Sequence, residues 1–547
     1  MSGALLEIRD LTVNLPPGAD RDHAVQDLSL TLRRDEILCV VGESGSGKSV
    51  MARAVMRLLP EPRVHVGRGE IRFEGEDLLR ASVARMRQIR GRRISMIFQE
   101  PMTALNPLMT VGEQIDEVIE VHGKIPRARR TARVIEILND VRLPDPERIV
   151  QAYPHELSGG QRQRAMIAMA LILEPAILIA DEPTTALDVT TQAQILYLIK
   201  ELQAEHHTGV MFITHDFGVV AEIADRVAVM QDGRLVEFGE AAQVLNEARH
   251  PYTQSLIAAV PSLVPRRRKR ADEAPVLLDV RDIDKSYSAG GGLFGKPSRV
   301  VHAAKAVNFR IRRGETLGLV GESGSGKSTV ARCVVRLIEA DGGQVLLDGI
   351  DLRALRSREM NACRKRIQMI FQDPYGSLNP RLTVGRLIAQ GPMVHGAGLK
   401  EALDLAHELL ALVGLDPGGA QRYPHEFSGG QRQRIGVARA LALRPEVLVA
   451  DEPVSALDVS VQAQVLRLLA DIRDRFNLTM LFITHDLRVA AQVCDSIAVM
   501  RNGEIVEYGP TADIFADPRH PYTRELLDSV PGKDWATPIS TGLPREA

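Results

Sequence analysis

The stretch Gly42-Glu43-Ser44-Gly45-Ser46-Gly47-Lys48-Ser49 decides the fold of this chain, and it occurs twice. Residues Gly321–Ser328 repeat it without a single change. Both copies fit the pattern G-x-x-x-x-G-K-[ST], in which backbone N–H groups surround a phosphate and glycine permits the close approach. The lysine of such a loop reaches the outer phosphates, and the serine hydroxyl can bind Mg²⁺. Two copies therefore predict two nucleotide sites.

The residues around each loop support this interpretation. Short apolar runs at 37–41 and 316–320 predict buried strands that lead into the loops. Apolar residues recur at helical spacing after Ser49, so each loop opens a helix whose N-terminus faces the anion. The expected nucleotide-binding residues are Gly42, Ser44, Gly45, Gly47, Lys48, Ser49 and Val50, with Gly321, Ser323, Gly324, Gly326, Lys327, Ser328 and Thr329 in the second copy.

Composition indicates an ordinary soluble globular protein of two to four domains. The chain has 547 residues, of which 45% are apolar and 25% charged. Its 68 basic and 70 acidic residues nearly balance, which gives no electrostatic footprint for bulk nucleic-acid binding. No apolar run is long enough to span a bilayer, and residues 1–7 lack the features of a signal peptide. We therefore expect a cytosolic location.

The four cysteines form no C-x-x-C pair, so we expect neither a zinc site nor an iron–sulfur site. Cys39 and Cys333 lie in apolar segments and are expected to be buried free thiols.

Most of the chain is one unit written twice. Three pairs of segments recur with a common offset of 270 residues: Leu157–Arg164 with Phe427–Arg434, Asp181–Pro183 with Asp451–Pro453, and Phe212–Asp216 with Phe482–Asp486. We expect an α/β fold with two tandem domains at 1–262 and 276–531, joined by a basic linker at 263–275 and followed by a flexible tail at 532–547.

The linker contains five consecutive basic residues, Arg266–Arg270. Such a run could contact lipid headgroups or nucleic acid, but a solvated linker is more common.

In each half, an apolar run predicts a buried strand that ends in two acids. Asp181 and Asp451 come first and suit Mg²⁺, whereas Glu182 and Glu452 suit a general base that polarises water. An acidic strand-to-turn boundary is common in α/β folds, so the phosphate loop is what favours the functional interpretation.

Two further segments are candidates for phosphate contact. A small-residue turn opens a helix in each half and could form a second anion site, although a plain helix cap also explains it. Its residues are Ser158, Gly159, Gly160 and Gln161, with Ser428, Gly429, Gly430 and Gln431 in the second half. His215 and His485 each follow a predicted strand, and their matching offset favours a phosphate contact over a structural role.

Gln99 and Gln372 each end an apolar run and precede an acidic residue and a proline. Their amides could ligate Mg²⁺ reversibly, as a switch would need, although a surface turn remains an alternative.

Together these residues resemble the ATP-binding subunits of ABC transporters, over nearly the whole chain. The order matches that family: phosphate loop, Q-loop glutamine, signature turn, acidic pair, D-loop (Ala186–Asp188 and Ala456–Asp458) and switch histidine. The resemblance implies two P-loop NTPase domains, each with a mixed-sheet core and a helical signature subdomain, that hydrolyse ATP with Mg²⁺. Glu182, Glu452, His215 and His485 would be catalytic, and Ser49, Gln99, Asp181, Ser328, Gln372 and Asp451 would hold the metal.

A narrower match is to the peptide/nickel/opine importer branch. It rests on motifs that recur in both halves: Ala104–Pro107 and Ser377–Pro380, Tyr153–Glu156 and Tyr423–Glu426, and the His-Pro-Tyr-Thr segments at 250–253 and 520–523. The fused arrangement resembles microcin C-type and glutathione-type peptide importers. It implies two integral-membrane permease subunits, an extracytoplasmic substrate-binding protein and a peripheral position on the cytoplasmic face of the inner membrane. We expect no nucleic-acid partner and no metal cluster, since the cysteine cluster of some relatives is missing after the His-Pro-Tyr motif.

In that family each ATP lies between the phosphate loop of one half and the signature of the other. By resemblance, site one joins Lys48, Asp181, Glu182 and His215 to Ser428–Gly430, and site two joins Lys327, Asp451, Glu452 and His485 to Ser158–Gly160.

The two sites are not equivalent. Tyr287 stands where the family places an adenine-stacking aromatic residue, whereas the first half has Leu15, and Thr329 corresponds to Val50. Because an aromatic–base stack contributes roughly 1–3 kcal/mol, site one is expected to bind ATP about tenfold more weakly. Both halves keep the glutamate and the histidine, so both are expected to hydrolyse ATP.

The main alternative is a soluble twin-ATPase that acts on the ribosome. It would need a long, charged, helical linker, whereas the junction here is short. A DNA-repair ATPase would show zinc-type cysteine spacing, and a regulatory scaffold would show a degraded glutamate or signature; the chain shows neither.

Overall fold

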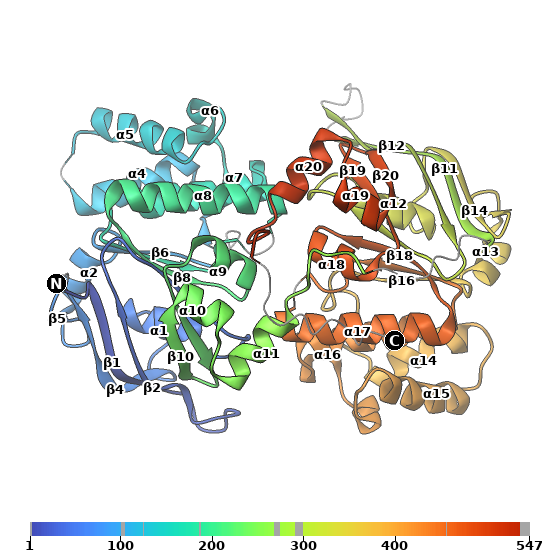
Figure 1. The fold of residues 1–547 in the computed structure, drawn as a ribbon, viewed down its shortest axis with the longest axis horizontal. Helices are drawn as coiled ribbons and strands as arrows, with labels where there is room; N and C mark the ends of the chain where they lie inside the picture. Colours follow the sequence, from blue (N-terminus) through green and yellow to red (C-terminus); the bar gives the residue numbers. More distant parts are fainter. Residues whose placement is uncertain are drawn as a thin grey trace. The chain divides into compact units, whose positions relative to one another are not determined.

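Each half is built around the short apolar strand that precedes its phosphate loop. Figure 1 shows the fold of the chain in a computed structural model. The structure describes residues 3–99, 104–123, 125–184, 187–266, 274–289, 299–455 and 457–535. Ala186, Ala456, most of the expected linker and all of the expected tail beyond residue 535 lie outside these ranges.

The chain forms two units. Unit 1 contains Met1–Leu187, Thr191–Val260 and, from the end of the chain, Val530–Ser540, of which residues 530–535 are described. Unit 2 contains Asp188–Thr190 and Pro261–Ser529. A segment from the C-terminal end therefore belongs to the same unit as the first half.

Unit 1 has a mixed sheet of order β10-β9-β3-β8-β7-β6, in which β10 is antiparallel to β9 and the other neighbours are parallel. Every residue of β3, β7 and β8 is buried, which suits strands covered on both faces. The strands are β3 (Ile37–Val41), β6 (Ile94–Ile97), β7 (Ile177–Asp181), β8 (Gly209–Ile213), β9 (Arg226–Gln231) and β10 (Arg234–Glu240).

Side chains of β3 alternate between two hydrophobic clusters. Ile37, Cys39 and Val41 face one cluster, and Leu38 and Val40 face the other. The second cluster includes a smaller antiparallel sheet of order β2-β1-β4-β5, formed by β1 (Leu6–Asn14), β2 (His23–Leu32), β4 (His65–Phe73) and β5 (Glu76–Asp77). The predicted burial of Cys39 is confirmed, and all four cysteines are buried.

Some helices of unit 1 cover the mixed sheet, and others form a separate group beyond it. Figure 1 shows α4, α5 and α6 gathered beyond α7 and α8, away from β1 and β4 of the same unit. The helices are α1 (Lys48–Val55), α2 (Val83–Ile89), α4 (Val111–His122), α5 (Arg127–Asp140), α6 (Pro146–Gln151), the 3₁₀ turn η1 (Pro154–Glu156), α7 (Gly159–Leu171), α8 (Val189–His206), α9 (Phe217–Ile223), α10 (Ala241–Asn246) and α11 (Pro251–Ala259).

Unit 2 repeats this plan. Its mixed sheet has the order β16-β17-β18-β13-β19-β20, and its antiparallel sheet has the order β12-β11-β14-β15. The strands are β11 (Val276–Ala289), β12 (Arg299–Arg312), β13 (Thr316–Val320), β14 (Gly342–Leu347), β15 (Ile350–Asp351), β16 (Ile367–Ile370), β17 (Val447–Asp451), β18 (Thr479–Thr484), β19 (Ser496–Arg501) and β20 (Glu504–Pro510).

The helices of unit 2 follow the same sequence order. They are α12 (Lys327–Val334), α13 (Ser357–Cys363), α14 (Val384–Val394), α15 (Leu399–Leu412), η2 (Pro417–Gln421), η3 (Pro424–Glu426), α16 (Gly429–Leu441), α17 (Val459–Phe476), α18 (Leu487–Val493), α19 (Thr511–Ala516) and α20 (Pro521–Asp528). The predicted α/β class with two mixed-sheet cores is confirmed. Across the described ranges, no helix combines the length and apolarity that crossing a membrane requires.

Candidate functional site

Sheet order brings the predicted site residues to one edge of each mixed sheet. In unit 1 the parallel strands β3, β8, β7 and β6 are neighbours, so the segments after their carboxyl ends meet there. These segments carry the phosphate loop, His215, Asp181 with Glu182, and Gln99. In unit 2 the matching strands β13, β18, β17 and β16 present Gly321–Ser328, His485, Asp451 with Glu452, and Gln372.

Glycine is required in the phosphate loops for two reasons. Gly47 and Gly326 have φ values of 101° and 108°, in the left-handed region that side chains disfavour. A Cβ at these positions would also collide with the carbonyl oxygens of Ala24 and Ala303. The loops therefore pack closely against the preceding antiparallel sheet. The helices that follow the loops, α1 and α12, begin at the lysine.

Each loop lysine is buried and folds back over its own loop. Lys48 Nζ donates to the carbonyl oxygens of Gly42 at 2.7 Å and Glu43 at 2.8 Å. Lys327 Nζ donates to Gly321 and Glu322 at 2.7 Å each. Burial lowers the pKa of Lys327, and the nearby carboxylates only partly offset this. A buried ammonium held in this way suits an anion that approaches the loop.

The serine that ends each loop is hydrogen-bonded to the first acid of the acidic pair. Ser49 Oγ donates to Asp181 Oδ1 at 2.9 Å, and Ser328 Oγ donates to Asp451 Oδ1 at 2.8 Å. Both aspartates are 1% exposed, and burial raises the pKa of each, partly countered by the serine. In unit 2 the other oxygen, Asp451 Oδ2, is buried and has no hydrogen-bond partner among the described residues.

The second acid of each pair joins the glutamine to the histidine. In unit 1, Gln99 Nε2 donates to Glu182 at 2.8 Å, and His215 Nδ1 lies 3.4 Å from the same carboxylate. The matching distances in unit 2, to Glu452, are 2.9 Å from Gln372 and 3.3 Å from His485. The glutamine lies 83 positions before the glutamate in unit 1 and 80 positions before it in unit 2, yet these residues and the histidine form one connected group in each unit.

The Glu452–His485 pair is arranged to hold opposite charges. Burial acts to raise the pKa of Glu452, but the hydrogen bond and charge of His485, with the charge of Lys327, hold it below its usual value. Burial conversely acts to lower the pKa of His485, and the contact with Glu452 more than compensates, so that it is raised. An ionised carboxylate at neutral pH is what a proton acceptor requires.

The signature turns cap the helices α7 and α16. Ser158 Oγ accepts from the Gln161 N–H at 3.3 Å while Gln161 Oε1 accepts from the Ser158 N–H at 2.9 Å, and Ser428 and Gln431 repeat this at 3.4 and 2.9 Å. A Cβ on Gly159 would meet nothing within 4 Å. The turn is therefore a capping box at a helix N-terminus, with open space beside Gly159.

Strand register supports the proposed difference between Leu15 and Tyr287. Asn14 pairs with His23 and Ser286 with His302, so the residues that follow, Leu15 and Tyr287, occupy equivalent places. Tyr287 is 41% exposed, and Lys285 Nζ lies 5.7 Å from its ring centroid. Leu15 and Val50 instead pack against the core cluster of unit 1.

Two kinds of contact with the loops carry no signal in the sequence that would predict them. Arg21, between β1 and β2, donates to the Gly45 carbonyl. No motif surrounds Arg21, so no signal could have revealed it. Tyr252 and Tyr522 of the His-Pro-Tyr segments also contact the loops. In the sequence, the His-Pro-Tyr segments indicate a family resemblance and do not predict a contact with the loops.

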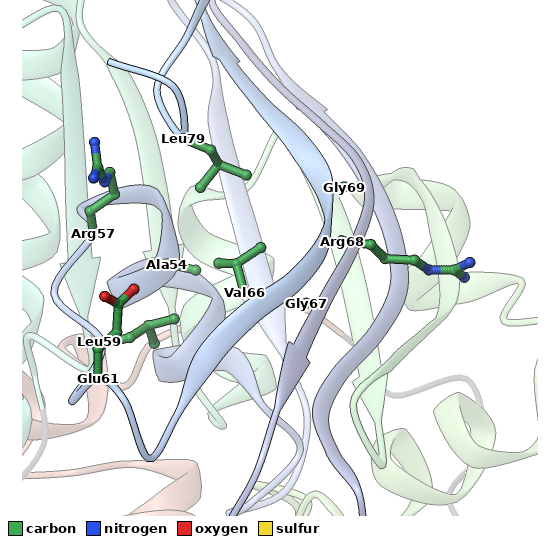
Figure 2. A pocket seen from close by; sticks show the side chains of 9 residues that line it. All are labelled: Ala54, Arg57, Leu59, Glu61, Val66, Gly67, Arg68, Gly69 and Leu79. Atoms are coloured by element: carbon green, nitrogen blue, oxygen red, sulfur yellow. The ribbon is translucent and has the colours of Figure 1, made fainter. Parts of the chain in front are cut away.

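A separate surface pocket of about 310 Å³ lies behind α1 in unit 1. Figure 2 shows its lining residues, which come from α1, from β4, from the segment between them and, with Leu79, from the segment after β5; Arg68 points away. Arg57 is engaged by the carbonyl of Ala81 at 2.6 Å. The pocket contains none of the predicted site residues.

Two models of known protein families match this chain. A model described as "ABC transporter" matches residues 25–185 and 304–455. The chain belongs to the ABC transporter family. A model of the oligopeptide/dipeptide transporter C-terminal region matches residues 236–288 and 506–542 of this ABC protein. This ABC protein therefore binds and hydrolyses ATP, as the sequence predicts.

Curated relatives of this ABC protein include the glutathione import ATP-binding proteins GsiA of Escherichia coli O157:H7, Shigella dysenteriae serotype 1 (strain Sd197) and Salmonella choleraesuis (strain SC-B67). Each is 48% identical over 560 residues, covering 97% of this chain and 90% of the relative. Among solved structures, a dimeric ATP-binding cassette in a post-hydrolysis state with ADP and Pi is 30% identical, with a TM-score of 0.39, covering 43% of this chain and 99% of that chain. The relatives favour an importer ATPase over the ribosome-acting alternative.

Proposed function

We propose that both units hydrolyse ATP to power the import of peptides or peptide-like solutes through separate membrane permeases. The observation that carries this proposal is the serine–aspartate pair beside the connected glutamine–glutamate–histidine group, present in both units. A regulatory scaffold would not need two complete sets.

The residues present fit Mg²⁺ with ATP. We assign as its ligands the side chains Ser49, Gln99 and Asp181 in unit 1, and Ser328, Gln372 and Asp451 in unit 2. The unpartnered Oδ2 of Asp451 is a buried acceptor that a cation would satisfy. No three His, Cys, Asp or Glu side chains gather as a metal site in the described ranges, which agrees with an ion that takes its other ligands from phosphate and water. When bound, Mg²⁺ neutralises charge on the phosphates.

The roles of the remaining residues follow from their contacts. Glu182 and Glu452 are assigned as acceptors for the proton of the attacking water, and Gln99 and Gln372 orient them. His215 and His485 hold the carboxylates and can contact the outer phosphate. The loop residues with the lysines bind the phosphates, Tyr287 stacks on adenine, and the signature residues 158–161 and 428–431 supply helix N-termini for the nucleotide.

Partners and location are inferred from the relatives. We propose two integral-membrane permeases and an extracytoplasmic binding protein as partners, with this chain on the cytoplasmic face of the inner membrane. The names of the relatives and the oligopeptide/dipeptide C-terminal regions support a peptide-like cargo. Glutathione, a small peptide, is the first candidate to test.

The roles of the glutamates are tested with Glu182→Gln, Glu452→Gln and the double variant. Glutamine keeps the shape and one acceptor oxygen but cannot take the proton, so hydrolysis in the double variant should fall by about 10²- to 10⁴-fold. Mg²⁺-dependent ATP binding should persist in the same protein. Glu201→Gln, at a surface ion pair with Arg142, is the matched control. Wild-type turnover by the double variant would contradict the assignment.

The transport role is tested by affinity purification of the full chain from membranes, followed by identification of the co-eluting proteins. Recovery of permeases is expected, and recovery of ribosomes would overturn the proposal. ATPase stimulation in vesicles that hold these permeases, with glutathione and its binding protein added, would then test the cargo.

A further inference from the structure

The phosphate loop of each unit is anchored by a tyrosine from far along the chain. The backbone N–H of Glu43 donates to Tyr252 Oη at 3.1 Å, and the N–H of Glu322 donates to Tyr522 Oη at the same distance. These pairs are separated by 209 and 200 residues. We propose that Tyr252 and Tyr522 are positioning residues that fix the first turn of each phosphate loop for ATP.

The residue whose N–H is bound by the tyrosine is also held through its carbonyl group. Lys48 Nζ donates to the carbonyl of Glu43, so the tyrosine and the lysine hold the N–H and the C=O of the same residue. Lys327 and Tyr522 hold Glu322 in the same way. Tyr252 and Tyr522 therefore hold the part of the loop whose carbonyl oxygens bind the lysine. The same lysine has to reach the phosphates of ATP.

The two preceding residues explain how the tyrosine is aimed. His250 is the N-cap of α11, and its Nδ1 accepts from the Tyr252 N–H at 3.2 Å. Pro251 starts the helix, where its fixed φ and missing N–H are favourable. Glu237 accepts the N–H groups of Arg249 at 2.7 Å and His250 at 3.1 Å, which ties the cap to β10.

Unit 2 repeats this support with the same chemistry. His520 Nδ1 accepts from the Tyr522 N–H at 3.2 Å, and Glu507 accepts from Arg519 at 2.8 Å and His520 at 3.1 Å. The His-Pro-Tyr motif is thus a device in which histidine caps, proline starts the helix and tyrosine reaches the loop.

The anchor is more enclosed in unit 2. Tyr522 is 1% exposed, and the Arg501 guanidinium lies 4.5 Å from its ring centroid. Gln231 occupies the place of Arg501 in unit 1, and Tyr252 is only partly buried. We therefore expect the loop of unit 2 to be the more rigid of the two.

The test uses the full chain with Tyr252→Phe and Tyr522→Phe, which keep the ring and remove only the hydroxyl. Without ATP, hydrogen exchange of the peptide that contains Glu43 or Glu322 should accelerate about five- to tenfold, because one hydrogen bond is lost. ATP affinity of the altered unit, measured by titration with Mg²⁺–ATP in a Glu→Gln background that does not turn over, should fall by a similar factor.

Tyr508→Phe is the matched control, since its hydroxyl is also hydrogen-bonded to the backbone, although there it donates, to the carbonyl of Arg310 at 3.0 Å. Tyr508 lies on β20, outside the His-Pro-Tyr segments. It should leave loop exchange and ATP affinity unchanged. A tyrosine that served only to stabilise the fold would lower the melting temperature without a local change in loop exchange. His250→Ala should reproduce the effect of Tyr252→Phe, and His250→Asn, which can still cap the helix, should restore the wild-type behaviour.

This inference rests on the assignment of the phosphate loops, yet the two fail separately. Unchanged exchange at Glu43 and Glu322 in both tyrosine variants would overturn the anchor. Faster exchange with unchanged ATP affinity would also overturn it, because the loop would then bind ATP whether or not it was fixed. Failure of the wild-type chain to bind ATP would instead overturn the loop assignment.

Discussion

At the scale of single residues, the acidic pairs show an unusual backbone. Glu182 and Glu452 have φ values of 48° and 44°, in the left-handed region that non-glycine residues seldom adopt. Such a conformation costs about 1–3 kcal/mol and persists where surrounding structure imposes it. Here each N–H donates to the next strand, at Ile213 and Ile483, at 3.0 Å. The same conformation recurs in both units, at the residue assigned as the proton acceptor.

Leu15→Tyr should strengthen ATP binding in unit 1. Leu15 occupies the register of Tyr287, and an aromatic–base stack contributes roughly 1–3 kcal/mol. We expect about a tenfold gain in affinity, and Tyr287→Leu should cause a comparable loss in unit 2. Site-resolved nucleotide titration measures both. Equal wild-type affinities at the two sites would contradict the proposed asymmetry.

At the scale of elements, the two units differ in the ion pairs near the strand that ends in the acidic pair. Glu446, just before β17, accepts from Arg313 at 2.8 Å and also contacts Arg366, and Arg366 binds Asp348 at 3.1 Å. Unit 1 has Ala176 in place of Glu446, although its Arg93 and Arg34 still pair with Glu74. In unit 2, the carboxylate of Glu446 thus adds a link among the segments that carry Arg313, Arg366 and Asp348. In unit 1, the matching segments are linked without such a carboxylate.

Glu446→Ala should reduce the stability of unit 2 in a pH-dependent way. The hydrogen bond from Arg366, with that from Arg313, holds the pKa of Glu446 below its usual value despite partial burial. Its contribution is therefore present above the unfolded pKa, near 4.5, and is lost as pH falls through the folded pKa.

Because the side chain is 33% exposed, we expect a loss of about 1 kcal/mol or less at pH 7. Hydrogen exchange of the peptides that cover β16 and β17, measured from pH 7 to pH 3, follows this difference. Glu504→Gln, a more exposed partner of Lys305, is the control. If the destabilisation caused by Glu446→Ala increased toward low pH, the predicted direction of the pH dependence would be wrong.

At the scale of the whole molecule, unit 1 is completed by residues from the end of the chain. The Gly532 N–H donates to Glu222 at 3.3 Å, and Trp535 Nε1 donates to Asn246 at 3.3 Å. The ring of Trp535 packs against the core cluster of unit 1. Gly218, on α9, allows this approach because a Cβ there would lie 2.7 Å from the carbonyl oxygen of Pro531.

Gly218→Val should displace this segment and destabilise unit 1 by about 1–3 kcal/mol. Trp535 is the only tryptophan of the chain, so its fluorescence reports the displacement as a shift to longer wavelength. Gly239→Ala is the matched control, since a Cβ there would have 3.5 Å to its nearest neighbours. An unchanged emission maximum in Gly218→Val would show that this packing does not hold the segment.

Much of this molecule was predictable from sequence because the evidence was local. An apolar run, a glycine-rich loop and a helical pattern lie within about twenty residues, and their repetition indicated two units of the same fold. The acids, glutamines and histidines follow apolar runs that predict strands, and parallel strands bring such ends together whatever their distance along the chain.

Other features depended on contacts that no local pattern encodes. The hydroxyl of Tyr252 on Glu43, Arg21 on Gly45 and the packing of Trp535 in unit 1 each join distant segments through side-chain direction and close backbone approach. The amino-acid sequence alone thus determined the ATPase family and predicted two sites and their chemistry, since these reside in short motifs. Only the tertiary structure decided what holds the loops in place, because such contacts arise from packing of complete elements.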